Sequence, residues 1–275
     1  MGNAVDLLDQ APPDVRVGEP VSREADRYDG IRQYSRTRTV GLWAAAAVPM
    51  GLLAWVVAPW LGDRIGGSEP LAKGLLICFN VGLIWILALT IVLVRREQGS
   101  LAWARVRDAL WMRPPRDPKS GRVGGKVWWW IVPYTLLFAA LTAAPLDPKG
   151  PVVRDLPRFI SDHKLRAEHF FHGAWGWFAL AVLVALLAPV VEELFFRGLL
   201  LPRMRRAFGK ADWGLNGAMF AGYHLHQPWS MPAALLTGVF THAYPTKRFQ
   251  SIWIAVFTHT LPSFVMIGVI LSFVL

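Results

Sequence analysis

Seven apolar stretches dominate this chain of 275 residues and restrict what it can fold into. They cover residues 40–61, 74–94, 127–146, 174–201, 213–225, 231–244 and 252–275. A hydrocarbon core of about 30 Å needs about 20 apolar residues of helix, and a soluble domain does not hold several such runs. We therefore predict an all-α, polytopic integral membrane bundle of about seven or eight transmembrane helices. The eighth would lie in the loop 147–172, and the short fifth and sixth runs fit tilted spans or a re-entrant pair.

Basic residues lie mainly in alternate loops between these runs, and the formal net charge is +10. They cluster before residue 40, within the loop 95–126, after residue 201 and before residue 252. The positive-inside rule assigns this side to the cytoplasm, so we expect a cytoplasmic N-terminus. Topology explains the positive charge, and we expect the lipid bilayer rather than nucleic acid as the partner. The Arg-, Ala- and Pro-rich composition is typical of a GC-rich bacterial genome, which predicts a bacterial cell membrane.

Two domains follow from the distribution of polar residues. Residues 1–38 mix acids, bases and prolines without an apolar core, which predicts a disordered cytoplasmic arm and no cleavable signal peptide. Residues 39–275 form the predicted membrane domain. Within its loop 95–126, the apolar and basic residues of 101–111 predict a short helix on the inner leaflet.

Ionisable residues inside three of the apolar runs carry the functional signal. Glu192 and Glu193 are adjacent, and His224 and His259 follow in later runs. A charged side chain at a membrane helix centre costs about 2.5–3.5 kcal/mol, so such residues mark functional sites. At 1.5 Å per residue, Glu192, His224 and His259 lie about 13, 16 and 10 Å from the cytoplasmic ends of their segments. We therefore predict one intramembrane active site, nearer the cytoplasmic face.

Helical spacing separates the roles of the two carboxylates. Glu193 and Arg197 are four residues apart, with the acid first, which favours an ion pair. Glu192 is rotated by about 100° from Glu193 and is free to face another direction. We predict a structural Glu193–Arg197 pair and a catalytic Glu192.

Other polar and aromatic side chains lie near these residues in the sequence. Phe220 shares a helical face with His224, and Ser263 shares one with His259. His226 is expected on the opposite side of the helix from His224, and His242 is expected to be interfacial. Zinc held by Glu192, His224 and His259 is an alternative to metal-free chemistry.

These residues resemble the CPBP family of intramembrane endopeptidases, which is named for CAAX proteases and bacteriocin-processing enzymes and is also called the Abi family. The family pattern is Glu-Glu-x-x-x-Arg, then Phe-x-x-x-His, then His-x-x-x-Asn. This chain reads Glu192-Glu193-x-x-x-Arg197, Phe220-x-x-x-His224 and His259-x-x-x-Ser263. The resemblance covers a core at about 174–270.

The resemblance implies an intramembrane endopeptidase of the glutamate type that needs no cofactor. Glu192 and His224 would activate a water, and His259 with the residue at 263 would stabilise the oxyanion. Ser263 stands where the family has Asn and offers one hydroxyl donor in place of an amide. The implied substrate is a membrane-associated protein or peptide. A catalytically inactive scaffold and a proton-coupled transporter remain the alternative functions.

Overall fold

The computed structural model describes Tyr28, residues 30–144 and residues 163–275. Most of the predicted arm therefore lies outside the described residues, and residues Arg32–Leu275 form one compact unit. The described part of this unit is mostly helical, with turns and loops between the helices and one isolated β-bridge between Arg116 and Val123. The predicted all-α class is confirmed. The division into two domains stays a prediction, and helix α1 begins at Arg36, inside the predicted arm.

Five helical segments are long and apolar enough to cross a membrane. Two of them are single helices, α3 Pro70–Gln98 and α14 Trp253–Val274. The other three are composite. Arg36–Ile65 consists of α1 Arg36–Leu52, the π-helix η1 Leu53–Val57 and α2 Ala58–Ile65, and Gly125–Ala143 consists of the 3₁₀-helix η2 Gly125–Trp130 and α5 Ile131–Ala143. Trp175–Arg203 consists of α9 Trp175–Glu193, the π-helix η3 Leu194–Leu200 and the 3₁₀-helix η4 Leu201–Arg203.

Local sequence explains several of the helix ends. Ser35 Oγ accepts a hydrogen bond from the Arg38 amide at the start of α1, and Gly99, with φ of 67°, ends α3 in the left-handed conformation.

The count of seven or eight spans is not confirmed. The fifth apolar run becomes α11 Asp212–Tyr223, and the sixth becomes α12 Met231–Thr237, the π-helix η8 Gly238–Ala243 and α13 Tyr244–Phe249. These pieces bring functional side chains into the bundle. Most of the loop that was considered for an eighth span lies outside the described residues.

The remaining helices are short: α4 Trp103–Ala109, α8 His163–Phe171, α10 Arg205–Phe208 and the 3₁₀ turns η5 Gly209–Ala211, η6 His224–His226 and η7 Pro228–Ser230. Helix α4 falls within the segment 101–111 that was expected to form a surface helix. Trp103 is 60% exposed, whereas Leu110 and Trp111, which follow the helix, are buried. The predicted short helix is therefore present and is anchored at its C-terminal end.

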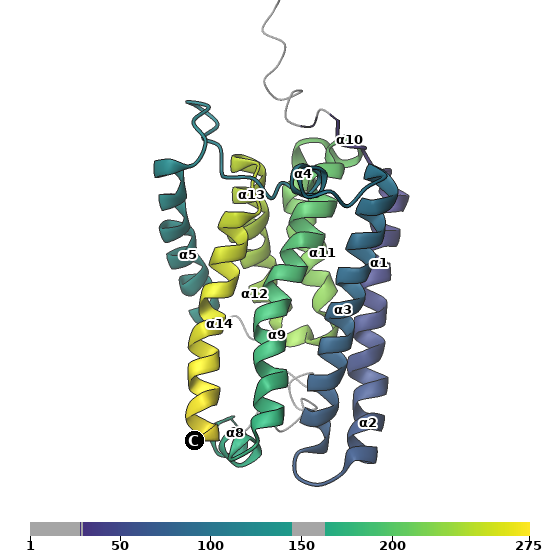
Figure 1. Cartoon of the computed structure of the whole chain (residues 1–275), viewed down its shortest axis with the longest axis vertical. Helices are drawn as coiled ribbons and strands as arrows, with labels where there is room; N and C mark the ends of the chain where they lie inside the picture. The colour runs from purple at the N-terminus through teal and green to yellow at the C-terminus, as the bar shows by residue number, and fades with distance from the viewer. Residues whose placement is uncertain (1–27, 29, 145–162) are drawn as a thin grey trace, which may run out of the picture. The chain divides into compact units, whose positions relative to one another are not determined.

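Helix α9 occupies the middle of the unit Arg32–Leu275 and packs against α3 on one side and α14 on the other (Figure 1). The main core joins buried apolar residues of α1, α3, α9, η3 and α11, whereas α5 packs against α14 and α12. Leu136, Phe264 and Val265 are among the large apolar side chains that point outward, at 66, 59 and 69% exposure. Such a surface is typical of a bundle that faces lipid.

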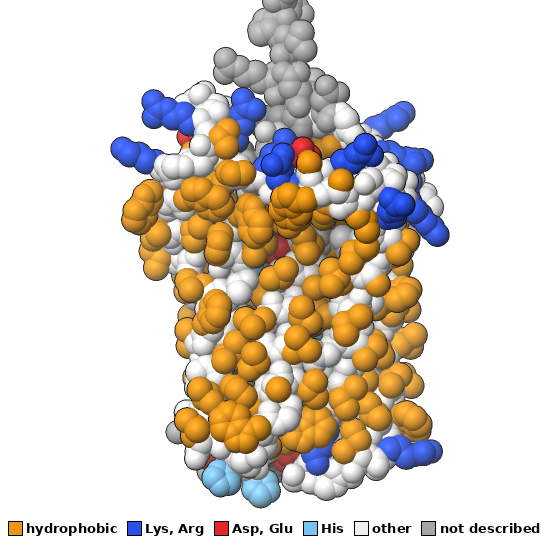
Figure 2. Space-filling view, viewed as in Figure 1, with side chains coloured by type: hydrophobic (Ala, Val, Ile, Leu, Met, Phe, Trp, Pro, Cys, Tyr) orange, Lys and Arg blue, Asp and Glu red, His pale blue; other side chains and the backbone are white. Residues whose placement is uncertain are grey.

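Figure 2 shows apolar side chains along the sides of this unit and most Lys and Arg side chains at the end where α4, α10 and α13 lie. That segregation fits the basic loops of the sequence. The assignment of the basic end to the cytoplasm stays a prediction.

A buried ion-pair network fixes the C-terminal end of the η3–η4 segment at this basic end. Arg203 Nε donates to Glu97 Oε2 at 2.8 Å, and Arg38 Nη2 donates to Glu97 Oε1 at 3.1 Å. Tyr34 Oη also donates to Glu97 Oε1. Arg203 is fully buried and donates to the carbonyl of Leu199 at 2.9 Å. The network ties the end of the segment that carries the two glutamates to α1 and α3.

Candidate active site

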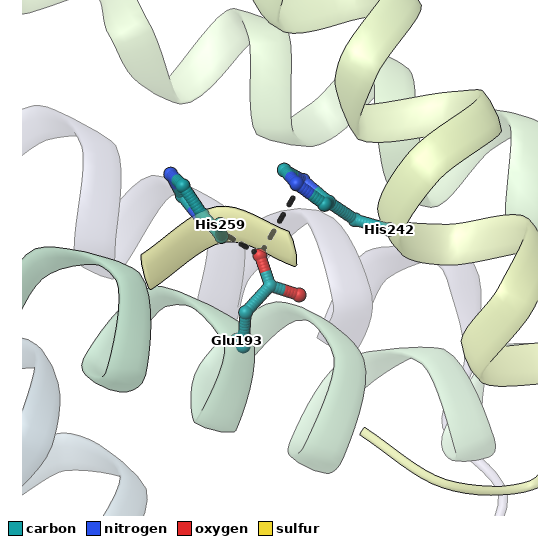
Figure 3. A group of neighbouring side chains, drawn as sticks. All are labelled: Glu193, His242 and His259. Atoms are coloured by element: carbon teal, nitrogen blue, oxygen red, sulfur yellow. Dashed lines mark hydrogen bonds and ion pairs between the residues drawn. The ribbon is translucent and has the colours of Figure 1, made fainter. Parts of the chain in front are cut away.

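Glu193 is the centre of a buried polar cluster at the end of α9. Its Oε1 lies 3.2 Å from Arg197 Nη1, 3.1 Å from His259 Nδ1 and 3.5 Å from His242 Nδ1. Both histidine rings point toward this carboxylate (Figure 3). Glu193 and Arg197 are completely buried, and they form the predicted ion pair.

π-Helical backbone lies on two sides of the cluster. Arg197 belongs to η3, which directly continues α9, and His242 belongs to η8. π-Helical turns inside longer helices are rare and occur frequently at functional sites, because the wider turn changes the direction of the side chains that follow. Pro189 precedes η3 within α9. The rotation of about 100° per residue that a regular α-helix gives its side chains therefore ends at Glu193, where η3 begins.

Arg197 is held from three directions. Besides the ion pair, Nη2 donates to the Gly238 carbonyl at 3.1 Å, and the guanidinium carbon lies 4.1 Å from the centre of the Phe220 ring. A desolvated cation over an aromatic face contributes about 2 kcal/mol. The arginine thereby links η3 to η8 and α11.

Phe220 is a common neighbour of the site histidines. Its ring centre lies 4.7 Å from that of His224, 5.9 Å from that of His242 and 6.0 Å from that of His259. All three contacts are edge-to-face, a favourable arrangement for aromatic rings. The supporting role predicted for Phe220 is compatible with this central position.

Two glycines allow α11 and η8 to approach this closely. A Cβ on Gly238 would lie 2.8 Å from Phe220 Cδ1, and a Cβ on Gly217 would lie 2.7 Å from Val239 Cα. Side chains at these positions would push His242 and Arg197 away from Phe220. Sequence analysis did not single out either glycine.

Glu192 is also buried, at 6% exposure, but it takes no part in the Glu193–Arg197 ion pair. It interacts electrostatically with His259 and Arg197 and with the Tyr223 hydroxyl. That hydroxyl is buried beside Glu192 without reaching strict hydrogen-bond geometry. Within the described residues, no hydrogen bond or ion pair joins Glu192 directly to His224. Tyr223 is a site residue that sequence analysis missed, although its place next to His224 offered a signal.

The environment of His224 defines its tautomer. Nδ1 lies 2.9 Å from the Phe220 carbonyl, and a carbonyl only accepts, so Nδ1 carries the proton and Nε2 of the neutral ring is unprotonated. The side chain is half-buried and interacts electrostatically with His259. His224 therefore presents an unprotonated nitrogen, and its ring packs among those of Phe220, Tyr223 and His226.

The expectation for His226 was wrong. Its ring stacks on that of His224, with centres 5.3 Å apart and an angle of 23°, and only 8% of the residue is exposed. The regular helix ends at Tyr223, and residues 224–226 form a 3₁₀ turn. The α-helical rotation that separated the two histidines therefore does not apply.

The expectation for His242 was also wrong. The residue is completely buried, and its ring stacks on His259 with centres 4.6 Å apart and an angle of 22°. The helical segment that carries it packs against α11 and α14 instead of ending at the surface. An ionisable residue within an apolar run was the signal that identified His224, and the same signal was present at His242.

Ser263 lies one turn after His259 in α14 and is half-buried. Among the described residues, it makes no hydrogen bond to Glu192, His224 or His259. Its predicted role in an oxyanion site stays a prediction.

The residues that could hold a metal ion differ from the three residues that the sequence suggested as zinc ligands. Glu193, His242 and His259 offer ligand atoms that all lie within 4.8 Å of one another. In the described part of the chain, this is the group of three such residues that could surround one ion. It shares only His259 with the set of Glu192, His224 and His259.

Comparison with known proteins gives one match. No curated protein and no solved structure matches the chain. A family model described as type II CAAX prenyl endopeptidase Rce1-like matches residues 174–265. This segment contains α9, η3, α11, η8 and the first part of α14, and with them every candidate site residue from Glu192 to Ser263. The match supports the resemblance found in the motifs: over residues 174–265 the chain is similar to the CAAX protease family.

Proposed function

We propose that this protein is an integral membrane endopeptidase that hydrolyses a peptide bond of a membrane-associated protein or peptide, with Glu192 and His224 activating the water. One observation carries the proposal. The segment that matches the CAAX protease family is also the segment that gathers Arg197, His224 and His259 around Phe220. Glu193 pairs with Arg197 there, and Glu192 lies beside the Tyr223 hydroxyl.

The contacts of the two carboxylates support Glu192 as the general base. Glu193 Oε1 already accepts hydrogen bonds from Arg197 and His259, so these partners occupy the oxygen that a water would need. Glu192 has no such ion pair to any residue that the structure describes, and it lies beside the Tyr223 hydroxyl, which positions it. In the proposed step, Glu192 takes a proton from the attacking water and later gives it to the leaving amine.

His224 and His259 take complementary parts in the proposed reaction. The unprotonated Nε2 of His224 accepts a hydrogen bond from the water and orients it. His259 donates its Nδ1 proton to Glu193 and, when its ring is doubly protonated, presents an Nε2 donor to the developing oxyanion. The Glu193 carboxylate offsets the charge of that imidazolium. The Ser263 hydroxyl supplies the second donor.

The scaffold and transporter alternatives predict different outcomes of one substitution. Glu192→Gln keeps the size of the side chain and removes its basicity, so we expect cleavage to fall by about 10²–10⁴-fold while the protein still folds. A scaffold would keep its function in this variant.

The assay compares the membrane proteomes of cells that carry the wild-type protein with those of cells that carry Glu192→Gln. Substrates are identified by new peptide termini that occur only in cells with the wild-type protein. Candidate substrates are then incubated with both proteins in detergent. Asp63→Asn, which neutralises an exposed carboxylate in α2, is the matched control and should retain full activity. Full activity of folded Glu192→Gln would refute the glutamate mechanism.

A further inference from the structure

The spacing of three ligand atoms around Glu193 matches that of a tetrahedral metal site. Glu193 Oε1 lies 3.1 Å from His259 Nδ1 and 3.5 Å from His242 Nδ1, and all three atoms fall within 4.8 Å of one another (Figure 3). Zinc binds nitrogen and oxygen at about 2.0–2.1 Å, so two ligand atoms of a tetrahedral site lie about 3.3 Å apart. Two of the three separations already have this value to within a few tenths of an ångström.

The environment of His242 favours a bound ion. The residue is completely buried, and neither of its ring nitrogens has a hydrogen-bond partner within the described residues. Glu193 Oε2 is also buried without a partner there. Buried polar atoms without partners are unfavourable, and those of native proteins generally need an explanation. A cation between the carboxylate and the two imidazoles would use the nitrogen of His242 that faces Glu193.

The surroundings include two acidic side chains. The cluster contains the carboxyl groups of Glu192 and Glu193 beside the single guanidinium of Arg197. Arg197 donates to Glu193 Oε1 and is itself held by Phe220 and Gly238. Carboxylates that bind metals are commonly oriented by such an outer hydrogen bond.

We propose that Glu193, His242 and His259 form a binding site for a divalent transition-metal ion of the zinc class, with the fourth position open. Two imidazole nitrogens and one carboxylate oxygen are ligands that zinc accepts in sites with an open position. Coordination through Nδ1 would leave the Nε2 proton of His259 available to a substrate oxygen. A metal on Nδ1 would replace the hydrogen bond that His259 donates to Glu193 in the proposed peptidase. The metal site therefore does not rest on that mechanism, and metal binding is measured without turnover.

The test uses the full chain in detergent, treated with a chelator and transferred to metal-free buffer. Co²⁺ serves as the probe because a tetrahedral site gives it strong visible absorption. We expect one equivalent of Co²⁺ per chain, displaced by Zn²⁺. His242→Phe keeps a ring that can stack on His259 and should weaken binding by at least about 10-fold, since loss of even an outer-shell partner costs about 10–100-fold. His226→Phe is the matched control, because it replaces another buried histidine outside the cluster, and it should bind as the wild type does.

Wild-type protein that binds neither ion, or folded His242→Phe that binds Co²⁺ as tightly as the wild type, would overturn the site. If His242→Phe does not fold, X-ray absorption spectroscopy of zinc bound to the wild-type protein gives the number of imidazole ligands. Two imidazole ligands support the proposal, and fewer than two overturn it. Glu192→Gln should retain the metal, so a failure of the peptidase mechanism is distinguishable from a failure of the metal site.

Discussion

Arg197→Ala should destabilise the protein more than almost any other change to an arginine, because the guanidinium is completely buried. The substitution removes the ion pair to Glu193 and the hydrogen bond to Gly238, at 3.2 and 3.1 Å, and the cation over Phe220. It also leaves the Glu193 carboxylate without its compensating charge. Breaking a buried pair by removing one partner costs about 3–5 kcal/mol.

The expected change is large enough to measure by thermal unfolding in detergent. At about 2–4 °C per kcal/mol for domains of 150–250 residues, the midpoint should fall by about 6–20 °C. Arg96→Ala removes an exposed arginine of α3 and should change stability by no more than about 0.5 kcal/mol. The double variant Glu193→Gln/Arg197→Met removes both charges and should recover part of the loss. An unchanged midpoint in Arg197→Ala would refute the buried pair.

Three further changes test other parts of the structure. Gly217→Ala should cost about 1–3 kcal/mol, because its Cβ would press against the backbone of Val239; a melting temperature equal to that of the wild type would contradict the close approach. Ser263→Asn introduces the usual family residue and should maintain or raise cleavage, because the longer amide reaches further as an oxyanion donor; complete loss would show that the oxyanion site lies elsewhere. Arg203→Ala should cost about 3–5 kcal/mol by leaving Glu97 without its buried partner, while the folded fraction keeps its activity; loss of activity without loss of stability would argue against a structural role.

Local sequence determined the helical class and the position of most long helices. A run of about 20 apolar residues satisfies its backbone internally only as a helix. The run 74–94 accordingly lies within α3, and α14 fills almost all of the run 252–275. The Glu193–Arg197 ion pair joins residues four apart in the sequence, and it is present at 3.2 Å although Arg197 lies in the π-helix η3.

Tertiary structure decided which side chains meet. His242 enters the cluster because Gly217 and Gly238 let η8 pack closely against α11, a contact between segments that no local spacing encodes. His226 stacks on His224 because α11 ends at Tyr223, where the rotation of a regular helix stops. Periodicity thus determines the faces of single helices, whereas contacts between helices determine which of those faces form the site.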